Sequence, residues 1–436
     1  MARWRWLLLQ FTRKLWVRAT LIGALGILAA MAAALAERYL PWDLPGSISA
    51  QAVDSILSII ASSMLAVTTF SLSIMTSAFG AATNTVTPRA TVLLIQDGIT
   101  QNVLSTFIGS FLFSIVALVV LQTGAYGPRG RLVLFVVTVG IIVLIVIALL
   151  RWINHLMLLG RVGETTDRVE RATRTAIEAR LDNPFLGGRE LRNAGRARPP
   201  ATEAVRAGTT GYVQFIDMAA LQAEGERAGR PLQVPAIPGT FVYPDTVLAW
   251  LGQPDAGPDG QAGPEADPEA DPEARAERIR QAFSVGTRRS YDQDPRFGVV
   301  VLSEIAIRAL SPAVNDSGTA IDVIGRCARL LALWAEGPRA DPGQSPEFPD
   351  VHVAAIRSED LFDDAFRLVA RDGAAQIEVQ SRLQKALRAL RHTGDPSFRQ
   401  AAAYQSQLAL QRAEQAMAMD ADKQLLRDIV ADARMP

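Results

Sequence analysis

Cysteine, histidine and lysine are scarce in this sequence. The 436 residues contain one cysteine, Cys327, and three scattered histidines, His155, His352 and His392. A single cysteine cannot form an intrachain disulfide, and the Cys/His spacing of a zinc site is missing. Apolar residues at helical spacing around Cys327 predict a core position for it. We therefore expect neither a metal nor a cofactor.

The usual sequence signatures of enzymes are also missing. The chain has no glycine-rich phosphate loop and no nucleophile elbow. Catalysis by paired carboxylates leaves no such signature and stays open, but we expect a protein that is not an enzyme. The 44 basic residues balance the 44 acidic ones, which gives no indication of nucleic-acid binding.

Long apolar runs are instead abundant in the first third of the chain. They cover Val17–Leu35, Ile56–Phe79, Val103–Leu121 and Leu132–Leu150. A helix needs roughly 20 mainly apolar residues to cross the hydrocarbon core of a bilayer, and each run provides about that length. The sequence therefore predicts an α-helical membrane protein with a four-span domain at residues 1–153, embedded in a lipid bilayer.

Charges around the first span predict its orientation. Arg3, Arg5, Arg13 and Lys14 precede this span, and an acidic loop follows it. The positive-inside rule then places the N-terminus in the cytoplasm, and four spans return the C-terminus to the same side. Trp4, Trp6 and Trp16 are typical of interfacial aromatic residues. A cleaved signal ending near Ala36 is the alternative, but its apolar run is too long.

A polar stripe distinguishes the second span. The 34 residues Ser55–Pro88 carry no charged side chain. Hydroxyl residues recur on one helical face, at Ser55, Ser58, Ser62, Thr69, Ser73 and Thr76. Two interpretations stay open: close packing in a central helix of a monomeric bundle, or the lining of a pore in a homo-oligomer, where Leu65 and Leu72 gate by dewetting.

The segment after the second span is small and polar. Residues 80–90 contain Pro88 near their end, which removes a backbone donor and predicts a break in the helix at a cytoplasmic mouth. Asn84 and Arg89 lie there. A ring of Arg89 would favour anions and Asp54 at the outer end would favour cations, so selectivity stays open. Arg89 is alternatively an interfacial anchor.

The remaining sequence predicts a cytoplasmic α+β domain. Its parts are a helical connector and loop at 154–207, continuing the fourth span as a helix; a small β-rich subdomain at 208–251; a flexible, acidic, Pro-rich insertion at 252–276; and a mostly helical part at 277–436. In the subdomain we expect strands at Gly211–Ile216, at Leu232–Val234 and within Pro238–Asp245.

A dense polar cluster lies at Leu310–Ala320. Its polar members are Ser311, Asn315, Asp316, Ser317 and Thr319. We expect Ser317 or Thr319 to cap a helix that continues to Trp334. The open N-terminus of such a helix also attracts anions, so ligand binding and ordinary capping are the two interpretations.

Several of these segments together resemble a known family. They are Thr83–Arg89, Gly211–Gln214, Pro238–Val242 and above all Ala309–Asp316. They are similar to bacterial predicted membrane proteins grouped as domain of unknown function 2254 (DUF2254). The resemblance covers nearly the whole chain and implies four N-terminal spans followed by a soluble domain. It carries no activity.

The hydroxyl stripe favours one function. We expect a homo-oligomeric ion channel of the bacterial inner membrane, with the second span lining a pore for inorganic ions and the cytoplasmic domain regulating it. The alternative is a membrane-anchored sensor or scaffold that binds a ligand or partner through its cytoplasmic domain.

Overall fold

The chain folds into two units. The computed structural model describes Trp6, Thr12 and residues 15–39, 49–95, 97–124, 126–157, 160–191, 203–252, 271–339, 343 and 345–431. One unit covers Leu7–Thr165, and the other covers Thr166–Pro436 together with Met1–Trp6. Each unit is described by itself below.

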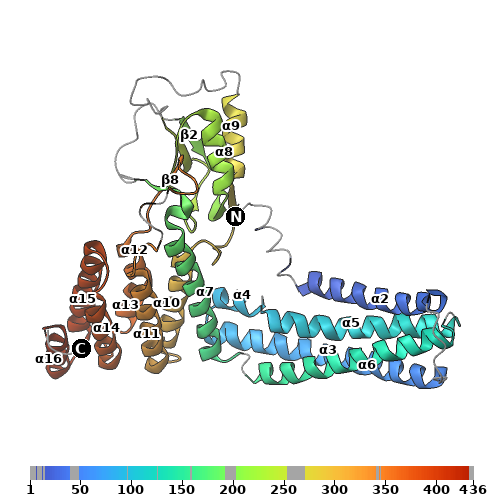
Figure 1. The fold of residues 1–436 in the computed structure, drawn as a ribbon. Coiled ribbons are helices and arrows are strands. Elements are labelled where there is room, and N and C mark those ends of the chain that lie inside the picture. Colours follow the sequence, from blue (N-terminus) through green and yellow to red (C-terminus); the bar gives the residue numbers. More distant parts are fainter. Residues whose placement is uncertain are drawn as a thin grey trace. The chain divides into compact units, whose positions relative to one another are not determined.

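The first unit is a bundle of four long helices (Figure 1). They are α2 (Leu15–Tyr39), α3 (Ala50–Thr85), α5 (Gly98–Gln122) and α6 (Pro128–Leu156), with a short helix α4 (Pro88–Ile95) between α3 and α5. All four are long and apolar enough to cross a bilayer. The prediction of four N-terminal spans is confirmed.

Helix α5 occupies the centre of the bundle and packs against α2, α3 and α6. Glycine brings α2 very close to it, because a Cβ atom on Gly109 would lie 2.6 Å from Cγ2 of Ile22. Small residues of this kind let membrane helices approach each other closely. Between α5 and α6, buried Tyr126 donates a hydrogen bond of 2.8 Å to the carbonyl of Ala30 in α2.

Two helix boundaries differ in part from the predictions. The break after the second span occurs, but α3 continues to Thr85 because the first proline it meets is Pro88, which begins α4. The fourth span does not continue as one helix. Helix α6 ends at Leu156 and α7 (Val162–Asp182) begins separately, with Gly160 between them at a φ of +82°, which interrupts a helix.

The second unit contains two small sheets. The five-stranded sheet has the order β1-β8-β4-β6-β2 and the three-stranded sheet the order β5-β3-β7. Their strands are β1 (Arg189–Glu190), β2 (Glu203–Arg206), β3 (Gly211–Ile216), β4 (Leu232–Val234), β5 (Phe241–Val242), β6 (Val247–Leu251), β7 (Phe283–Gly286) and β8 (Val351–Val353). The three predicted strands are confirmed. The two sheets also contain strands from outside residues 208–251, namely β1, β2, β7 and β8.

Helices α8 (Met218–Ala228) and α9 (Pro272–Gln281) and the short helix η1 (Pro184–Gly187) accompany the sheets. Residues 253–270 of the predicted insertion lie outside the described residues. Its last part is helical rather than flexible, since Pro272 begins α9 and Asp271 accepts a hydrogen bond of 3.0 Å from the backbone of Glu273. An acidic cap followed by proline at the first position is a strong helix start.

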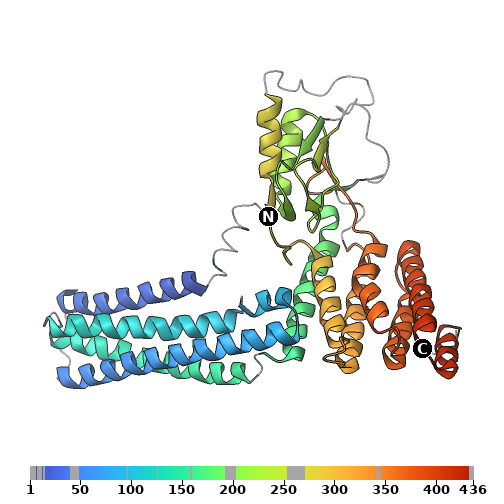
Figure 2. The ribbon, with the colours of Figure 1, turned by 180° about the vertical axis from the view of Figure 1, so that it is seen from behind.

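The rest of the second unit is helical (Figure 2). It contains α7, α10 (Pro295–Ala309), α11 (Ser317–Trp334), α12 (Ser358–Phe362), the π-helical turn η2 (Asp363–Arg367), α13 (Leu368–Asp372), α14 (Ile377–Leu390), α15 (Pro396–Ala416) and α16 (Asp420–Ala431). Cys327 on α11 is fully buried, as expected. Burial raises the pKa of its thiol to about 12.

Candidate functional site

The predicted pore residues of α3 all lie on the outside of the bundle. Leu65 and Leu72 are 52% and 48% exposed. The hydroxyl residues of the stripe are exposed as well, namely Ser55, Ser58, Ser62, Thr69, Ser73 and Thr76. Among the described residues, the stripe is therefore not covered by another part of the chain.

The opposite face of α3 is the one that packs on the bundle. Its buried residues are Val53, Leu57, Ile60, Met64, Ser71 and Met75. At about 100° per residue, these positions and the stripe project to opposite sides of the helix. The interpretation of α3 as the central, buried helix of a monomeric bundle is therefore wrong, because α5 takes that position.

Several stripe hydroxyls donate within their own helix. Ser62 donates to the carbonyl of Ser58 at 2.9 Å, Thr69 to Leu65 at 2.9 Å and Thr76 to Leu72 at 2.8 Å. These bonds satisfy the donors and leave the oxygen lone pairs facing outward. The stripe therefore presents a row of oxygen acceptors toward the outside of the bundle.

The two residues predicted at the cytoplasmic mouth belong to different helices. Asn84 lies in the last turn of α3, and Arg89 is an exposed residue in the first turn of α4. The backbone therefore turns between them. Arg89 therefore does not continue the stripe along the face of α3.

A buried polar cluster in the first unit was not predicted. Asp97 is the N-cap of α5 and accepts hydrogen bonds of 2.8 Å from both the backbone and the hydroxyl of Thr100. His155, near the end of α6, is 5% exposed and lies 3.1 Å from the Asp97 carboxylate and 3.0 Å from the Thr100 hydroxyl. The cluster ties α6 to the start of α5, and only tertiary contact brings its members together.

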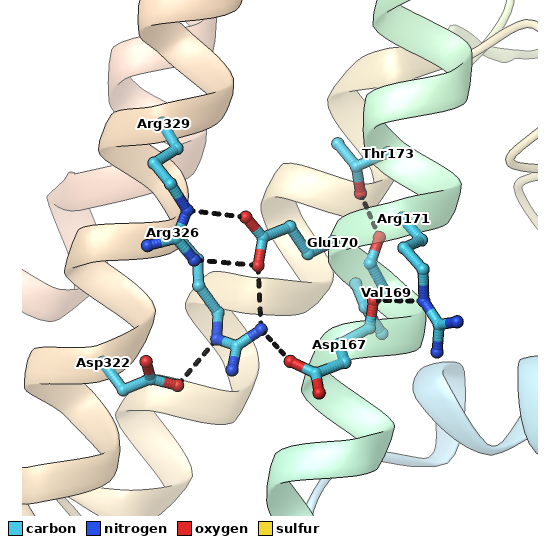
Figure 3. Close-up of polar contacts among 8 residues, drawn as sticks. All are labelled: Asp167, Val169, Glu170, Arg171, Thr173, Asp322, Arg326 and Arg329. Atoms are coloured by element: carbon cyan, nitrogen blue, oxygen red, sulfur yellow. Dashed lines mark hydrogen bonds and ion pairs between the residues drawn. The ribbon is translucent and has the colours of Figure 1, made fainter.

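An ion-pair network joins α7 to α11 in the second unit (Figure 3). Arg326 pairs with Asp167, with Glu170 at 2.8 Å and with Asp322 at 2.6 Å, and Arg329 pairs with Glu170 at 2.9 Å. Burial by itself lowers the pKa of Arg326, but the hydrogen bonds and charges of the carboxylates raise it above the ordinary value. Arg326 therefore remains a fixed cation that holds the two helices together.

The segment Tyr291–Gly298 forms a second junction that the sequence analysis did not identify. The side chain of Gln293 accepts a hydrogen bond of 2.9 Å from the backbone of Ile216 in β3. Asp294 caps α10 and forms a bidentate pair with Arg289 at 2.7 and 2.9 Å. A Cβ atom on Gly239 would lie 2.4 Å from the same carboxylate, so the Pro238–Val242 loop approaches it closely.

Helix α7 also contributes a buried cation to this junction. Arg180 is 7% exposed and donates to the carbonyl of Gln293 at 3.1 Å. Burial lowers its pKa to about 10, and the charge of Asp294 opposes the shift. The junction therefore connects α7, α10 and the three-stranded sheet. The pattern Asp-Pro before an apolar run, a helix-start signal, was the one clue in the sequence.

The predicted polar cluster at Leu310–Ala320 is a helix start, but a different residue caps it. Asp316 is the N-cap of α11 and accepts from the backbone of Thr319 at 3.0 Å and from its hydroxyl at 2.5 Å. The prediction of Ser317 or Thr319 as the cap is wrong, because Ser317 is already helical. The predicted end at Trp334 is confirmed.

The residues before this cap form a tight turn. Ser311 donates its hydroxyl to the carbonyl of Arg308 at 2.7 Å, and Asn315 adopts a positive φ of 49°. The hydroxyl and carboxylate groups of the cluster thus serve the turn and the cap.

Comparison with known proteins agrees with this architecture. A family model described as "Predicted membrane protein (DUF2254)" matches residues 12–389. The chain belongs to this family of predicted membrane proteins. Family membership agrees with the four apolar helices and with the resemblance carried by Ala309–Asp316.

Relatives of this DUF2254 chain occur in mycobacteria. Uncharacterized proteins of Mycobacterium bovis and Mycobacterium tuberculosis are 25% identical to it over 361 residues, which covers 78% of this chain and 64% of theirs. The chain thus spans somewhat less than two thirds of the length of these relatives. No solved structure matches it.

Proposed function

We propose that this DUF2254 protein forms a homo-oligomeric ion channel of the bacterial inner membrane, with one copy of α3 from each subunit lining the pore. The observation that carries the proposal is the outward position of the six stripe hydroxyls and of Leu65 and Leu72 on a helix apolar enough to span the bilayer. Lipid solvates oxygen acceptors poorly, so such a face favours water or another protein surface.

The geometry of the stripe supports pore formation. The exposed Leu65 and Leu72 alternate with hydroxyls along it. Around a symmetry axis, the hydroxyl rungs would replace part of the hydration of an ion, and the leucine rungs would form constrictions that gate by dewetting. Both termini would lie in the cytoplasm, and the second unit would regulate the pore.

The accessibility of a thiol to water tests this arrangement. Cys327 is fully buried and its thiol has a raised pKa, so the natural chain should not react with a charged methanethiosulfonate reagent. We expect Thr69→Cys in liposomes to react at least tenfold faster than Thr20→Cys. Thr20 is the matched control because it is an exposed threonine of α2 whose hydroxyl also donates within its helix.

Conduction is the second readout. Currents through the reconstituted protein should change when Thr69 and Ser73 are both replaced by leucine, and should be unaffected by Thr20→Leu. Equally slow modification of Thr69→Cys and Thr20→Cys would contradict a water-filled pore along α3.

A membrane-anchored sensor or scaffold is the second candidate function. It is favoured by the hydrogen bonds of Ser62, Thr69 and Thr76 to their own helix, since satisfied donors make a lipid-facing stripe less costly. This function predicts that leucine at Thr69 and Ser73 leaves all properties of the protein unchanged. Ligand-dependent shifts in the unfolding temperature of the full chain would support it.

A further inference from the structure

Trp6 precedes the first span by only a few residues, yet it belongs to the second unit. Its indole stacks on Phe215 of β3, with ring centroids 5.0 Å apart and an interplanar angle of 15°. The indole nitrogen donates a hydrogen bond of 2.8 Å to the Asp292 carboxylate, and the side chain is only 4% exposed. The interpretation of Trp6 as an interfacial aromatic is therefore wrong, whereas Trp16 is 59% exposed on α2.

A bulge in β3 creates the surface on which the indole lies. The pairing of β3 with β7 shifts between Val213 and Phe215. Val213 and Ile216 consequently face the same hydrophobic core, although they are three positions apart and would lie on opposite faces of a regular strand. Phe215 is left on the other face of the strand, since neighbouring side chains alternate.

The polar side of the same surface is also preorganised. Ser290 donates its hydroxyl to the Asp292 carboxylate at 3.0 Å, and the backbone of Asp292 donates back to Ser290 at 3.2 Å. An aromatic face beside a fixed carboxylate suits an indole, which offers one apolar ring and one N–H donor.

We propose that Phe215 and Asp292 form a docking surface for the N-terminal segment of the chain itself, with Trp6 as its anchor. Residues 7–14 link Trp6 to the start of α2, a connection that reaches at most roughly 30 Å. Docking of Trp6 would thereby hold this end of the segment on the second unit. The inference does not depend on ion conduction.

Hydrogen exchange of the full-length protein in lipid nanodiscs tests the docking. In Trp6→Ala, we expect the amides of residues 287–293 and 213–216 to exchange at least tenfold faster than in the natural chain. Asp292→Asn, which keeps the ring stack and removes only the charged acceptor, should give a smaller increase in the same segments. Trp16→Ala is the matched control and should leave both segments unchanged.

Two results would overturn the inference. One is exchange in both segments within twofold of the natural chain for Trp6→Ala and for Asp292→Asn. The other is an equal acceleration in Trp16→Ala, which would indicate a general loss of stability. Should Trp6→Ala fail to fold, Trp6→Phe and Asp292→Asn decide the question, because Trp6→Phe removes the hydrogen bond and keeps a ring, whereas Asp292→Asn removes the charge of the acceptor and keeps the indole in place.

Discussion

Gly298 on α10 lies directly against Thr173 on α7. A Cβ atom at Gly298 would be 1.8 Å from the Thr173 hydroxyl oxygen and 2.7 Å from its Cβ. Thr173 cannot easily move, because it is fully buried and its hydroxyl donates to the carbonyl of Val169 at 2.6 Å. The absence of a side chain at Gly298 thus sets the separation of the two helices.

Replacing Gly298 by alanine should therefore destabilise the second unit. We expect a loss of about 1–3 kcal/mol in the free energy of unfolding, the usual cost of overpacking. Thermal unfolding of the purified protein measures it. Gly163→Ala on α7 is the control, since no atom lies within 4 Å of its Cβ position. Adding Thr173→Ala to Gly298→Ala should restore stability; if it does not, the clash is not the cause.

Arg326 should contribute more to stability than Arg329. Its side chain is 11% exposed and contacts three carboxylates, whereas Arg329 is 54% exposed and contacts one. We expect Arg326→Met to cost about 1–3 kcal/mol, because it leaves the part-buried Glu170 with less compensation. Arg329→Met should cost ~0–1 kcal/mol, as exposed pairs do. Denaturant unfolding compares the two, and equal losses would contradict this ranking.

Asp316 should make the free energy of unfolding depend on pH in the acid range. Hydrogen bonds from the side chain and backbone of Thr319 lower the pKa of its carboxyl group in the folded protein. Its stabilising contribution is therefore complete above the ordinary aspartate pKa of about 4 and is lost as the pH falls through the lower, folded value.

Two substitutions separate the charge of Asp316 from its capping role. Asp316→Asn keeps a good cap, so it should nearly preserve the unfolding temperature at pH 7 and lose this part of the acid dependence. Asp316→Ala should cost about 1 kcal/mol at pH 7. Unfolding temperatures measured from pH 3 to pH 7 provide the test. An identical pH dependence in the natural chain and Asp316→Asn would refute the assignment.

Gly109 should control the packing of the first unit. Its Cβ position lies 2.6 Å from a side-chain carbon of Ile22 and 3.3 Å from the backbone of the same residue. Gly109→Val should push α2 away from α5 and destabilise the bundle by about 1–3 kcal/mol. Gly140→Val on α6 is the control, because no atom lies within 4 Å of that Cβ position. Unfolding in increasing fractions of dodecyl sulfate would reveal the difference.

The sequence predicted what depends on local pattern. Long apolar runs are sufficient to predict the four membrane helices. The hydrocarbon core offers no hydrogen-bond partner, so backbone groups there must bond to one another, as they do in a helix. A short run rich in aromatic and β-branched residues was likewise sufficient for the strand Gly211–Ile216. Helix ends were less predictable, since Asp316, Ser317 and Thr319 are all good caps and only the backbone conformation selects among them.

Tertiary structure decided which surfaces meet. The sequence identified the hydroxyl stripe of α3, but only packing showed that it faces away from the bundle and that α5 is central. The interactions of Trp6 with Phe215 and Asp292, and of Thr173 with Gly298, join residues more than 100 positions apart. No period along the chain encodes such contacts, because they depend on the distances and angles at which complete helices and sheets pack.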